Sequence, residues 1–311
     1  MLKEVLLSQR SGERRSTLAD RITASLPSLT NAERRAARAL LARYPTAGLE
    51  TVALFAERAG VSAPTILRFI GKLGFDGYAD FRRALREELE AQSQYPLTRP
   101  PEGDMASSGL AVLGQRLAAT ISDTLAMCDR NELDRFVAAL SDERRDVYLL
   151  GGDFTDVAAR HLEFHLRKMR PRIRLVEHDL IRRSDQLADL RRRDLFILFD
   201  IRRYQRDSVA TARLAAARGA IIVLLTDQWM SDAAEAADIV FRARVDGPSR
   251  WDSLVGMIAL VEILVQAYDE HVWSRSRARV ETIEEHRRAL SGREGASVAP
   301  LGQITEMFVT S

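Results

Sequence analysis

A hydroxyl and two cations recur at helical spacing in a short segment near the N-terminus. Thr65, Arg68 and Lys72 lie three and four positions apart, so they share one side of a helix that turns by about 100° per residue. Ser62 and Pro64 precede them, where such a helix would begin. Cations and hydroxyls on one helix face can contact phosphate oxygens and base edges. The segment therefore predicts a nucleic-acid surface.

This surface lies on the second of two short predicted helices, residues 52–58 and 62–73. Ser62 suits the N-cap, because its hydroxyl can accept an otherwise unpaired amide hydrogen, and Pro64 is tolerated in the first turn. Gly74 closes the helix as a left-handed cap would. Two helices joined by a tight turn form either an ordinary αα-hairpin or a helix-turn-helix, whose second helix reads bases in the major groove.

The other side of the second helix is apolar and is expected to pack on a core. Its residues are Ile66, Phe69, Ile70 and Leu73. Residues 52–86 carry an excess of three positive charges, which is the sign required where phosphates must be neutralised.

In the second half of the chain, apolar runs of strand length alternate with helical stretches. The runs are residues 147–150, 173–176, 195–199, 221–225 and 239–241, and the clearest helices between them are 156–169 and 207–218. Strands that are apolar throughout and separated by helices are typical of a parallel sheet covered on both faces. We expect an α/β domain with a five-stranded, doubly wound parallel sheet.

Ligands of such sheets bind beyond the carboxyl ends of the strands. The candidate ligand-binding residues lie at the ends of the first, third and fourth predicted strands. They are Gly151, Gly152, Thr155, Arg202, Arg203, Gln205 and Thr226. A glycine turn that opens onto a helix N-terminus favours anions. Arg202 or Arg203 could clamp a phosphate or carboxylate through its planar fork. Alternatively, Asp200 and Asp207 neutralise the two arginines and the domain only dimerises.

Candidate acid–base residues also occur, since a sugar isomerase must move a proton between adjacent carbons. They are His161, Glu163, His165, Glu262 and His271. His161 and His165 are four residues apart and could act as bases or hold a metal, but they do not form an HExxH motif. Such residues are more often solvated or hydrogen-bonded. We expect no catalysis, no cofactor and no bound metal.

Residues 52–78 resemble the N-terminal domain of the RpiR family of bacterial regulators. The matching residues are Gly60-Val61-Ser62, Thr65, Arg68-Phe69, Lys72-Leu73-Gly74-Phe75 and Gly77-Tyr78. The flanks match as well, with helices expected at residues 32–43 and 81–90. This resemblance implies an all-α helix-turn-helix domain that binds double-stranded DNA.

The second half resembles the SIS (sugar isomerase) domain, which RpiR regulators carry behind their reader domain. The matching features are the glycine turn after the first strand, residues 217–220, Thr226, residues 236–238 and Ser253. SIS domains generally bind phosphosugars, so the resemblance implies a phosphosugar or related anionic effector.

Both SIS loops depart from the family pattern. Asp153 replaces the second glycine of Gly-x-Gly-x-Ser, and Thr155 replaces its serine. In the second loop the family has Ser-x-Ser-Gly-x-Thr, whereas residues 200–205 read Asp-Ile-Arg-Arg-Tyr-Gln. The serines, the glycine and the threonine are all absent from it.

The resemblance leads to specific roles on the reader helix. We expect Thr65 and Arg68 to contact base edges or nearby phosphates, Lys72 to contact phosphate, and Ser62 to combine capping with a backbone contact. Pro64 would pack on a thymine methyl group. The alternatives are a ligand-independent repressor, whose SIS domain is only a dimerisation scaffold, and a phosphosugar isomerase.

The expected organisation is a DNA-binding domain at residues 1–92, a linker at 93–109, the SIS-like domain at 110–290 and a flexible tail at 291–311. Further helices are expected at residues 110–127, 132–140, 251–271 and 275–290. The apolar helix at 254–268 would hold a homodimer or homotetramer, so that two readers meet a near-palindromic operator.

The bulk properties agree with a cytoplasmic protein that does not contact membranes. The net charge is only +2 and the chain has a single cysteine, Cys128, so no intrachain disulfide is possible. The longest apolar stretch, residues 254–268, is too short and too polar to span a bilayer. The first residues have too short an apolar run for a signal peptide.

Overall fold

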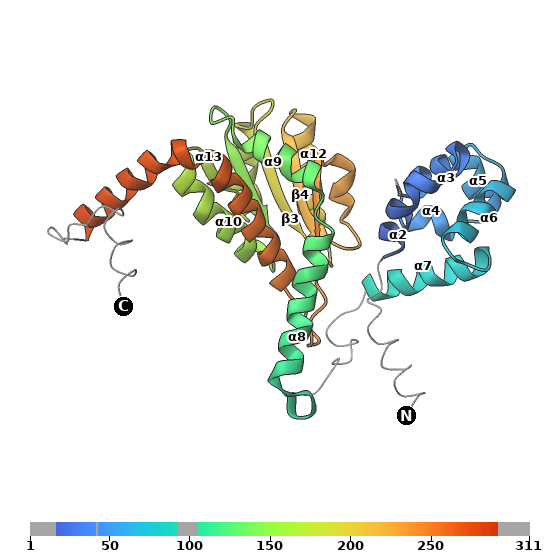
Figure 1. Cartoon of the computed structure of the whole chain (residues 1–311). Helices are drawn as coiled ribbons and strands as arrows, with labels where there is room; N and C mark the ends of the chain where they lie inside the picture. The colour runs from blue at the N-terminus through green and yellow to red at the C-terminus, as the bar shows by residue number, and fades with distance from the viewer. Residues whose placement is uncertain (1–16, 42, 93–104, 292–311) are drawn as a thin grey trace.

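The computed structural model describes residues 17–41, 43–92 and 105–291 of the chain (Figure 1). Its N-terminal part is helical throughout. The elements are α2 (Leu18–Ser25), η1 (Leu26–Ser28), α3 (Asn31–Leu41), α4 (Thr46–Leu49), α5 (Val52–Ala59), α6 (Ala63–Lys72) and α7 (Tyr78–Gln92).

Helices α5 and α6 form the predicted pair. Gly60 ends α5 in the left-handed conformation at φ 61°, which costs glycine little because it has no Cβ. Gly74 follows α6 at φ 84°, as predicted. The apolar side of α6 packs into the domain core, where Phe69 and Ile70 are fully buried together with Phe55 of α5.

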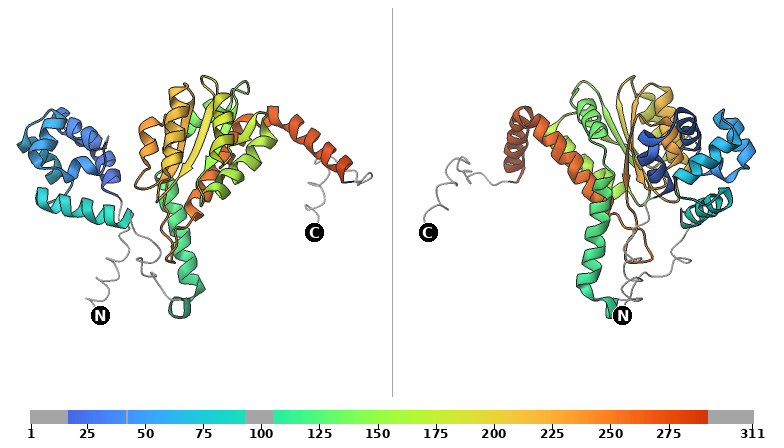
Figure 2. Two further views of the ribbon diagram at one scale, coloured as in Figure 1. Left: turned by 180° about the vertical axis from the view of Figure 1, so that it is seen from behind. Right: turned by 45° about the vertical axis from the view of Figure 1, so that its right-hand side comes forward.

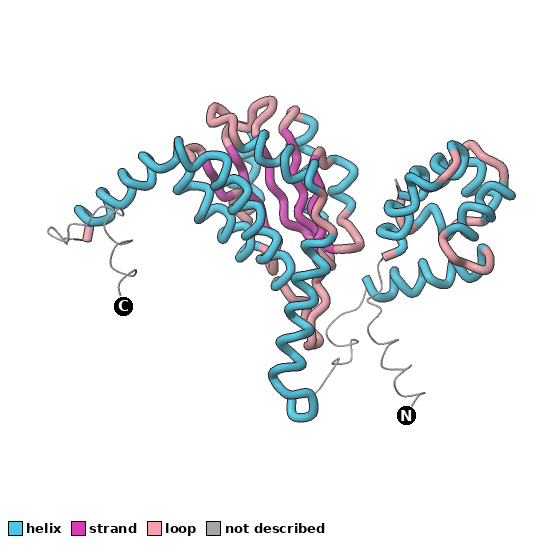
Figure 3. Tube along the Cα trace, in the orientation of Figure 1, coloured by secondary structure: helices cyan, strands magenta, loops and turns pink. Residues whose placement is uncertain are grey.

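The C-terminal part is built on a five-stranded parallel sheet, drawn in magenta in Figure 3. Its strands are β1 (Val147–Gly151), β2 (Ile173–Leu175), β3 (Leu195–Asp200), β4 (Ile221–Asp227) and β5 (Ile239–Ala243), in the order β2-β1-β3-β4-β5. The crossover segments contain α10 (Asp156–Met169), α11 (Leu180–Ala188), α12 (Arg206–Ala217) and η2 (Asp232–Ala236). The order reverses between β1 and β3, so the predicted doubly wound sheet is confirmed.

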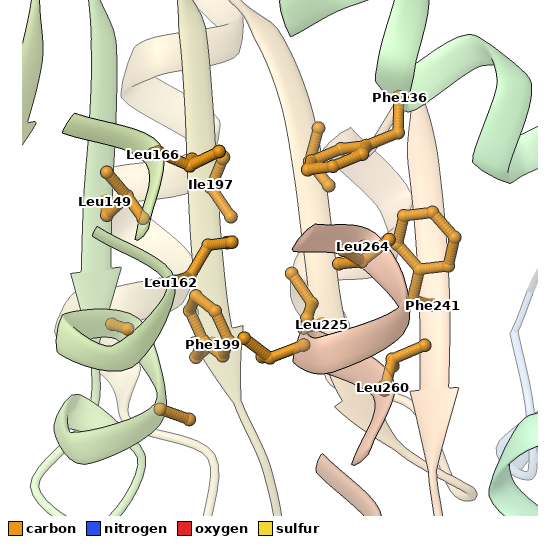
Figure 4. Close-up of a cluster of buried hydrophobic side chains, with 14 of the residues drawn as sticks. Phe136, Leu149, Leu162, Leu166, Ile197, Phe199, Leu225, Phe241, Leu260 and Leu264 are labelled. Carbon is orange, nitrogen blue, oxygen red and sulfur yellow. The ribbon is translucent and has the colours of Figure 1, made fainter. Parts of the chain in front are cut away.

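Helices cover both faces of the sheet, because successive strand residues point to opposite sides. One face packs against α9 (Arg130–Leu140), α10 and α13 (Val255–Leu290). Figure 4 shows this core, with Leu162 of α10 and Leu264 of α13 beside Phe199 and Leu225 of the sheet. The other face packs against α11 and α12, with Phe196 at its centre.

The last helix differs from the prediction. Residues 251–271 and 275–290 were expected to form two helices, but α13 is one helix of 36 residues. No glycine or proline stands between residues 271 and 275, so nothing in the sequence ends the helix there. Beyond Val272 most of its residues are exposed, and Figure 2 shows this part extending past the sheet.

Helix α8 (Met105–Ala126) begins earlier than predicted and overlaps the expected linker at 93–109. Gly109 lies inside it with non-helical angles of φ 66° and ψ 157°. Residues 93–104 and nearly all of the predicted tail lie outside the described residues. Among the described helices, none is long and apolar enough to cross a bilayer.

Candidate nucleic-acid interface and effector cavity

The outward face of α6 carries most of the residues predicted to meet DNA. Ser62, Pro64, Arg68 and Lys72 are exposed. Thr65 was expected on this open face, but only 5% of it is accessible. That expectation was wrong, because Thr65 lies at the edge of the helix face, beside the core residues.

The Thr65 hydroxyl instead connects two exposed residues of the same helix. Its Oγ1 lies 2.9 Å from Ser62 Oγ and accepts a hydrogen bond of 3.3 Å from Arg68 Nη2. Ser62 occupies the N-cap of α6, but its side chain makes no capping bond to a backbone amide. The predicted capping hydrogen bond is therefore wrong, since the Ser62 hydroxyl is paired with Thr65.

Lys72 is attached to the domain through a buried carboxylate. Its Nζ donates to Glu33 Oε2 at 2.7 Å, and the same oxygen accepts from the amide and hydroxyl of Thr30 at 2.8 and 2.9 Å. Thr30 and Glu33 thus form a capping box at the start of α3. The Lys72 hydrogen bond, followed by those of Thr30, lowers the Glu33 pKa to about 2. This pair fixes the end of α6 against α3 while 44% of the Lys72 side chain stays exposed.

Leu67 is a residue that the sequence interpretation missed. It is 47% exposed on α6, next to Arg68. At 100° per residue Leu67 projects between Ala63 and Gly71, at the border of the polar face, so a full helical projection could have found it. An apolar side chain in this position can contact a thymine methyl group.

The second candidate site is a cavity of about 300 Å³ at the carboxyl ends of β1 and β3, where the strand order reverses. Its lining residues come from the loops after these strands and from the segment before α13. They are Gly152, Asp153, Phe154, Thr155, Asp200, Ile201, Arg202, Arg203, Gln205, Trp251 and Asp252. Five predicted ligand residues are therefore brought together.

Two predicted ligand residues, Gly151 and Thr226, are not among those that line the cavity. A Cβ on Gly151 would lie 2.3 Å from the Asp156 Cα, so this glycine permits close packing of β1 on α10. Thr226 is fully buried, and its hydroxyl accepts from the Ser231 amide at 3.1 Å. Both residues support the walls of the site.

Thr155 lines the cavity, but its hydroxyl is bonded to backbone. Oγ1 donates to the Phe199 carbonyl and accepts from the Gly152 amide, each at 2.8 Å. The side chain of Gln205 approaches the same loop, since a Cβ on Gly152 would lie 2.6 Å from its Oε1. These contacts join the loops after β1 and β3.

Arg202 is buried, with 6% of the residue accessible, and it has protein counter-charges. Its guanidinium lies 3.4 Å from Asp252 and 3.7 Å from Asp246, and it stacks on the Trp229 ring at 4.3 Å. Carboxylates thus neutralise Arg202, as the alternative interpretation expected. They are Asp246 and Asp252, so the prediction of Asp200 and Asp207 as its partners was wrong.

Asp200 and Asp207 have other partners. Asp200 accepts from the Ser231 hydroxyl and from the Gln205 amide, and Asp207 pairs with Arg183 at 2.8 Å. Burial raises the pKa of Asp200 to about 6, and the Ser231 hydrogen bond opposes this shift.

Arg203 has a distinctive backbone. It lies in the left-handed region at φ 74°, at the position where the resembled SIS loop has glycine. A non-glycine residue there is strained by about 1–2 kcal/mol. Its side chain is exposed and lines the cavity. Strained residues cluster at ligand sites, so Arg203 is the stronger candidate for an anion contact.

The candidate acid–base residues lie outside the described lining of the cavity. His161 Nε2 and Glu262 Oε1 are 2.6 Å apart, and Glu163 pairs with Arg167 at 3.5 Å. His165 packs edge-to-face on His161, and His271 is exposed on α13.

Comparisons with known proteins identify both domains. The profile of a helix-turn-helix domain of the rpiR family matches residues 16–92, and that of the SIS domain matches residues 139–267. The transcriptional regulator HexR of Escherichia coli is 21% identical over 272 residues, covering 86% of this chain and 92% of HexR. An uncharacterised HTH-type regulator of Providencia stuartii is 25% identical over 224 residues, covering 70% and 79%.

Two solved structures have a similar fold. The sugar isomerase domain of an RpiR transcription factor from Sphaerobacter thermophilus is 29% identical, with a TM-score of 0.53, over 57% of this chain and 98% of that domain. The NanR protein of Vibrio vulnificus is 21% identical, with a TM-score of 0.51, over 88% of this chain and 99% of NanR.

A helix-turn-helix reader joined to a SIS domain defines a DNA-binding transcriptional regulator. The chain belongs to the RpiR family of these regulators.

Proposed function

We propose that the exposed face of α6 reads an operator and that the cavity after β1 and β3 binds a sugar-sized effector with an anionic group. The observation that carries the DNA half is the face of α6 itself. Arg68 is exposed there, and its guanidinium is oriented by the buried Thr65 hydroxyl. In this reading Leu67 and Pro64 contact apolar base edges, while Lys72 and Ser62 contact phosphates.

The effector half rests on the size and charge of the cavity. A volume of about 300 Å³ suits a monosaccharide derivative. Arg203 and the amide end of α10 favour an anionic group, and the carboxylates of Asp153 and Asp252 can accept hydrogen bonds from sugar hydroxyls. The similar NanR structure is described as a complex with ManNAc-6P, which supports a phosphosugar.

The test of the DNA half begins with an operator selected from randomised duplexes. Arg68→Ala should then weaken operator binding by about 10- to 100-fold more than binding to random DNA, since one arginine–guanine pair contributes about 1–3 kcal/mol of discrimination. Gel shifts at fixed salt measure both affinities. Arg135→Ala is the control, because this arginine is also exposed and paired, with Glu132, but lies in the other domain. An equal loss on both duplexes would make Arg68 a phosphate contact only.

The ligand-independent alternative is tested by thermal shift. We expect stabilisation by a member of a panel of sugar phosphates, sugar acids and uncharged sugars. A panel without any stabilising compound would favour a SIS domain that acts only as a scaffold.

We also propose that the protein has no isomerase activity. Glu163, one of the candidate bases on α10, is paired with Arg167 and lies outside the described cavity lining. Incubation with ketose and aldose phosphates should give no conversion. Conversion that is abolished in Glu163→Ala would contradict this proposal.

A further inference from the structure

Two histidines and a glutamate converge outside the effector cavity and are unused by the proposed function. His161 and His165 lie one turn apart on α10, and Glu262 faces them from α13. One nitrogen of each imidazole and one carboxylate oxygen all lie within 4.8 Å of one another. None of the three residues lines the cavity.

The spacing of this cluster is set by the core beneath it. Leu162 and Leu166 of α10, and Leu260 and Leu264 of α13, pack on the same face of the sheet (Figure 4). All four leucines are fully buried, so the two helix backbones are held in place. The three polar side chains therefore need only rotate about their χ angles to approach one another more closely.

The donor set selects a particular class of ligand. Two imidazoles and a carboxylate suit Zn²⁺ and other late first-row divalent ions, whereas Mg²⁺ and Ca²⁺ require mostly oxygen ligands. Metal–nitrogen bonds of about 2.0–2.1 Å require ligand atoms roughly 3–3.5 Å apart. Side-chain rotation can bring atoms that already lie within 4.8 Å to that spacing.

In the single chain the cluster is open to solvent, so a metal ion can reach it. The side chains of His161 and Glu262 are 33% and 55% accessible. The ammonium of Lys168, the next cation along this side of α10, lies over the Phe164 ring at 3.9 Å.

An ordinary ion pair is the competing explanation. His161 Nε2 and Glu262 Oε1 are 2.6 Å apart, and the two imidazole rings pack edge-to-face with centroids 4.9 Å apart. These contacts satisfy part of the cluster without a metal. They do not explain why His165 also points to the place where His161 and Glu262 meet. A metal site explains it, because His165 would supply the third ligand.

We propose that His161, His165 and Glu262 form a binding site for Zn²⁺ or a similar late first-row divalent ion, with a fourth coordination position left to water. The ion would replace the histidine–glutamate hydrogen bond and bridge α10 to α13. Helix α10 starts at the loop that lines the effector cavity, and α13 continues to Leu290. The bound ion would thus connect α10, which follows the cavity loop, to the long helix α13.

The test uses the full chain after tag removal and treatment with a chelator. Calorimetric titration with zinc chloride, together with metal analysis after dialysis, should give one zinc per chain. The thermal midpoint should rise by about 5 °C at a zinc concentration roughly 100-fold above Kd. Cobalt(II) bound in place of zinc should give visible absorption bands typical of a four-coordinate site.

Matched variants assign the site. His165→Ala and Glu262→Gln should each weaken zinc binding at least tenfold. The controls His178→Ala and Glu270→Gln should bind like the wild type, since these residues pair elsewhere, with Asp156 and Gln266. Cys128→Ser excludes the single thiol as a ligand. Circular dichroism checks that each variant is folded.

Two results would overturn the proposal. One is less than about 0.2 zinc retained per wild-type chain. The other is zinc affinity that is unchanged in folded His165→Ala and Glu262→Gln, because the metal would then bind elsewhere.

Discussion

Two arginines show how the same side chain takes different roles through its surroundings. Arg202 is enclosed by Asp246, Asp252 and the Trp229 ring, so its charge is already compensated inside the protein. Arg203, the next residue, is exposed on a left-handed backbone. A buried charge with partners stabilises a local arrangement, whereas an exposed side chain that lines a cavity can reach a ligand.

The first prediction at this scale concerns Arg203. Arg203→Gly removes the side chain and relieves the strain at φ 74°, so the free energy of unfolding should stay within about 1 kcal/mol of the wild type or rise. Stabilisation by the effector found in the thermal-shift panel should be lost. The measurement pairs chemical denaturation with thermal shift. Full effector response in this variant would show that Arg203 is not the anion contact.

The second concerns Thr65, which we assign as a positioning residue for Arg68. Thr65→Val keeps the buried shape but removes the hydroxyl that contacts Ser62 and Arg68. Operator affinity should fall several-fold, while stability changes by about 1 kcal/mol. Gel shifts and thermal melts measure the two effects. Rescue by Thr65→Ser, which restores the hydroxyl, separates positioning from packing.

Helix α6 can act as the proposed reader only because other elements hold it. Its apolar side packs on Phe55 and Phe81 in the domain core, while Glu33 of α3 binds Lys72 at its C-terminal end. The capping box of Thr30 and Glu33 therefore serves two helices at once. A change in α3 should alter how firmly the reader helix is held.

This coupling predicts a pH effect. The Glu33 pKa is lowered from 4.5 to about 2 in the folded protein, so its stabilisation is complete above about pH 4.5 and is lost as the pH falls toward 2. At pH 7, amide hydrogens in α3 and α6 should exchange faster in Glu33→Gln than in the wild type. The ratio of these two exchange rates should be smaller at pH 3. Glu87→Gln, an exposed residue near Arg83, is the control. A ratio that is constant with pH would contradict the assignment.

At the scale of the whole molecule, the proposed binding of two readers to one operator requires a contact between chains. Residues 254–268 were expected to supply the dimer contact through their apolar side chains. The structure uses Leu260, Leu264 and Tyr268 of this stretch in the core of the monomer. Exposed apolar residues remain on the neighbouring α10, at Val157 and Phe164. We therefore propose that the surface of α10, with the outer side of α13, mediates a homodimer or homotetramer.

Oligomerisation is measured by analytical ultracentrifugation with and without operator DNA. A dimer of the 34.9 kDa chain should form at micromolar concentration and bind one near-palindromic duplex. Phe164→Asp should shift it toward monomer and reduce affinity for the full operator more than for a half-site. A wild-type chain that stays monomeric on DNA would rule out the two-reader arrangement.

Much of the fold follows from local pattern. The buried strands were predictable because each is apolar along its whole length, and the reader helices because their apolar positions repeat at the helical period. Helix α11 was missed because its residues, Leu180–Ala188, are mostly polar. The length of α13 was missed, although no glycine or proline stands between residues 271 and 275.

The sequence by itself determined the class of protein, because the residues that match the RpiR pattern between Gly60 and Tyr78, and the glycine turn after the first strand, are local properties of the chain. Only the tertiary structure decided which polar side chains are free to meet a ligand. Burial of Thr65, the counter-charges of Arg202 and the meeting of His161 with Glu262 depend on residues distant in sequence. Such contacts are set by packing between elements, which no local pattern encodes.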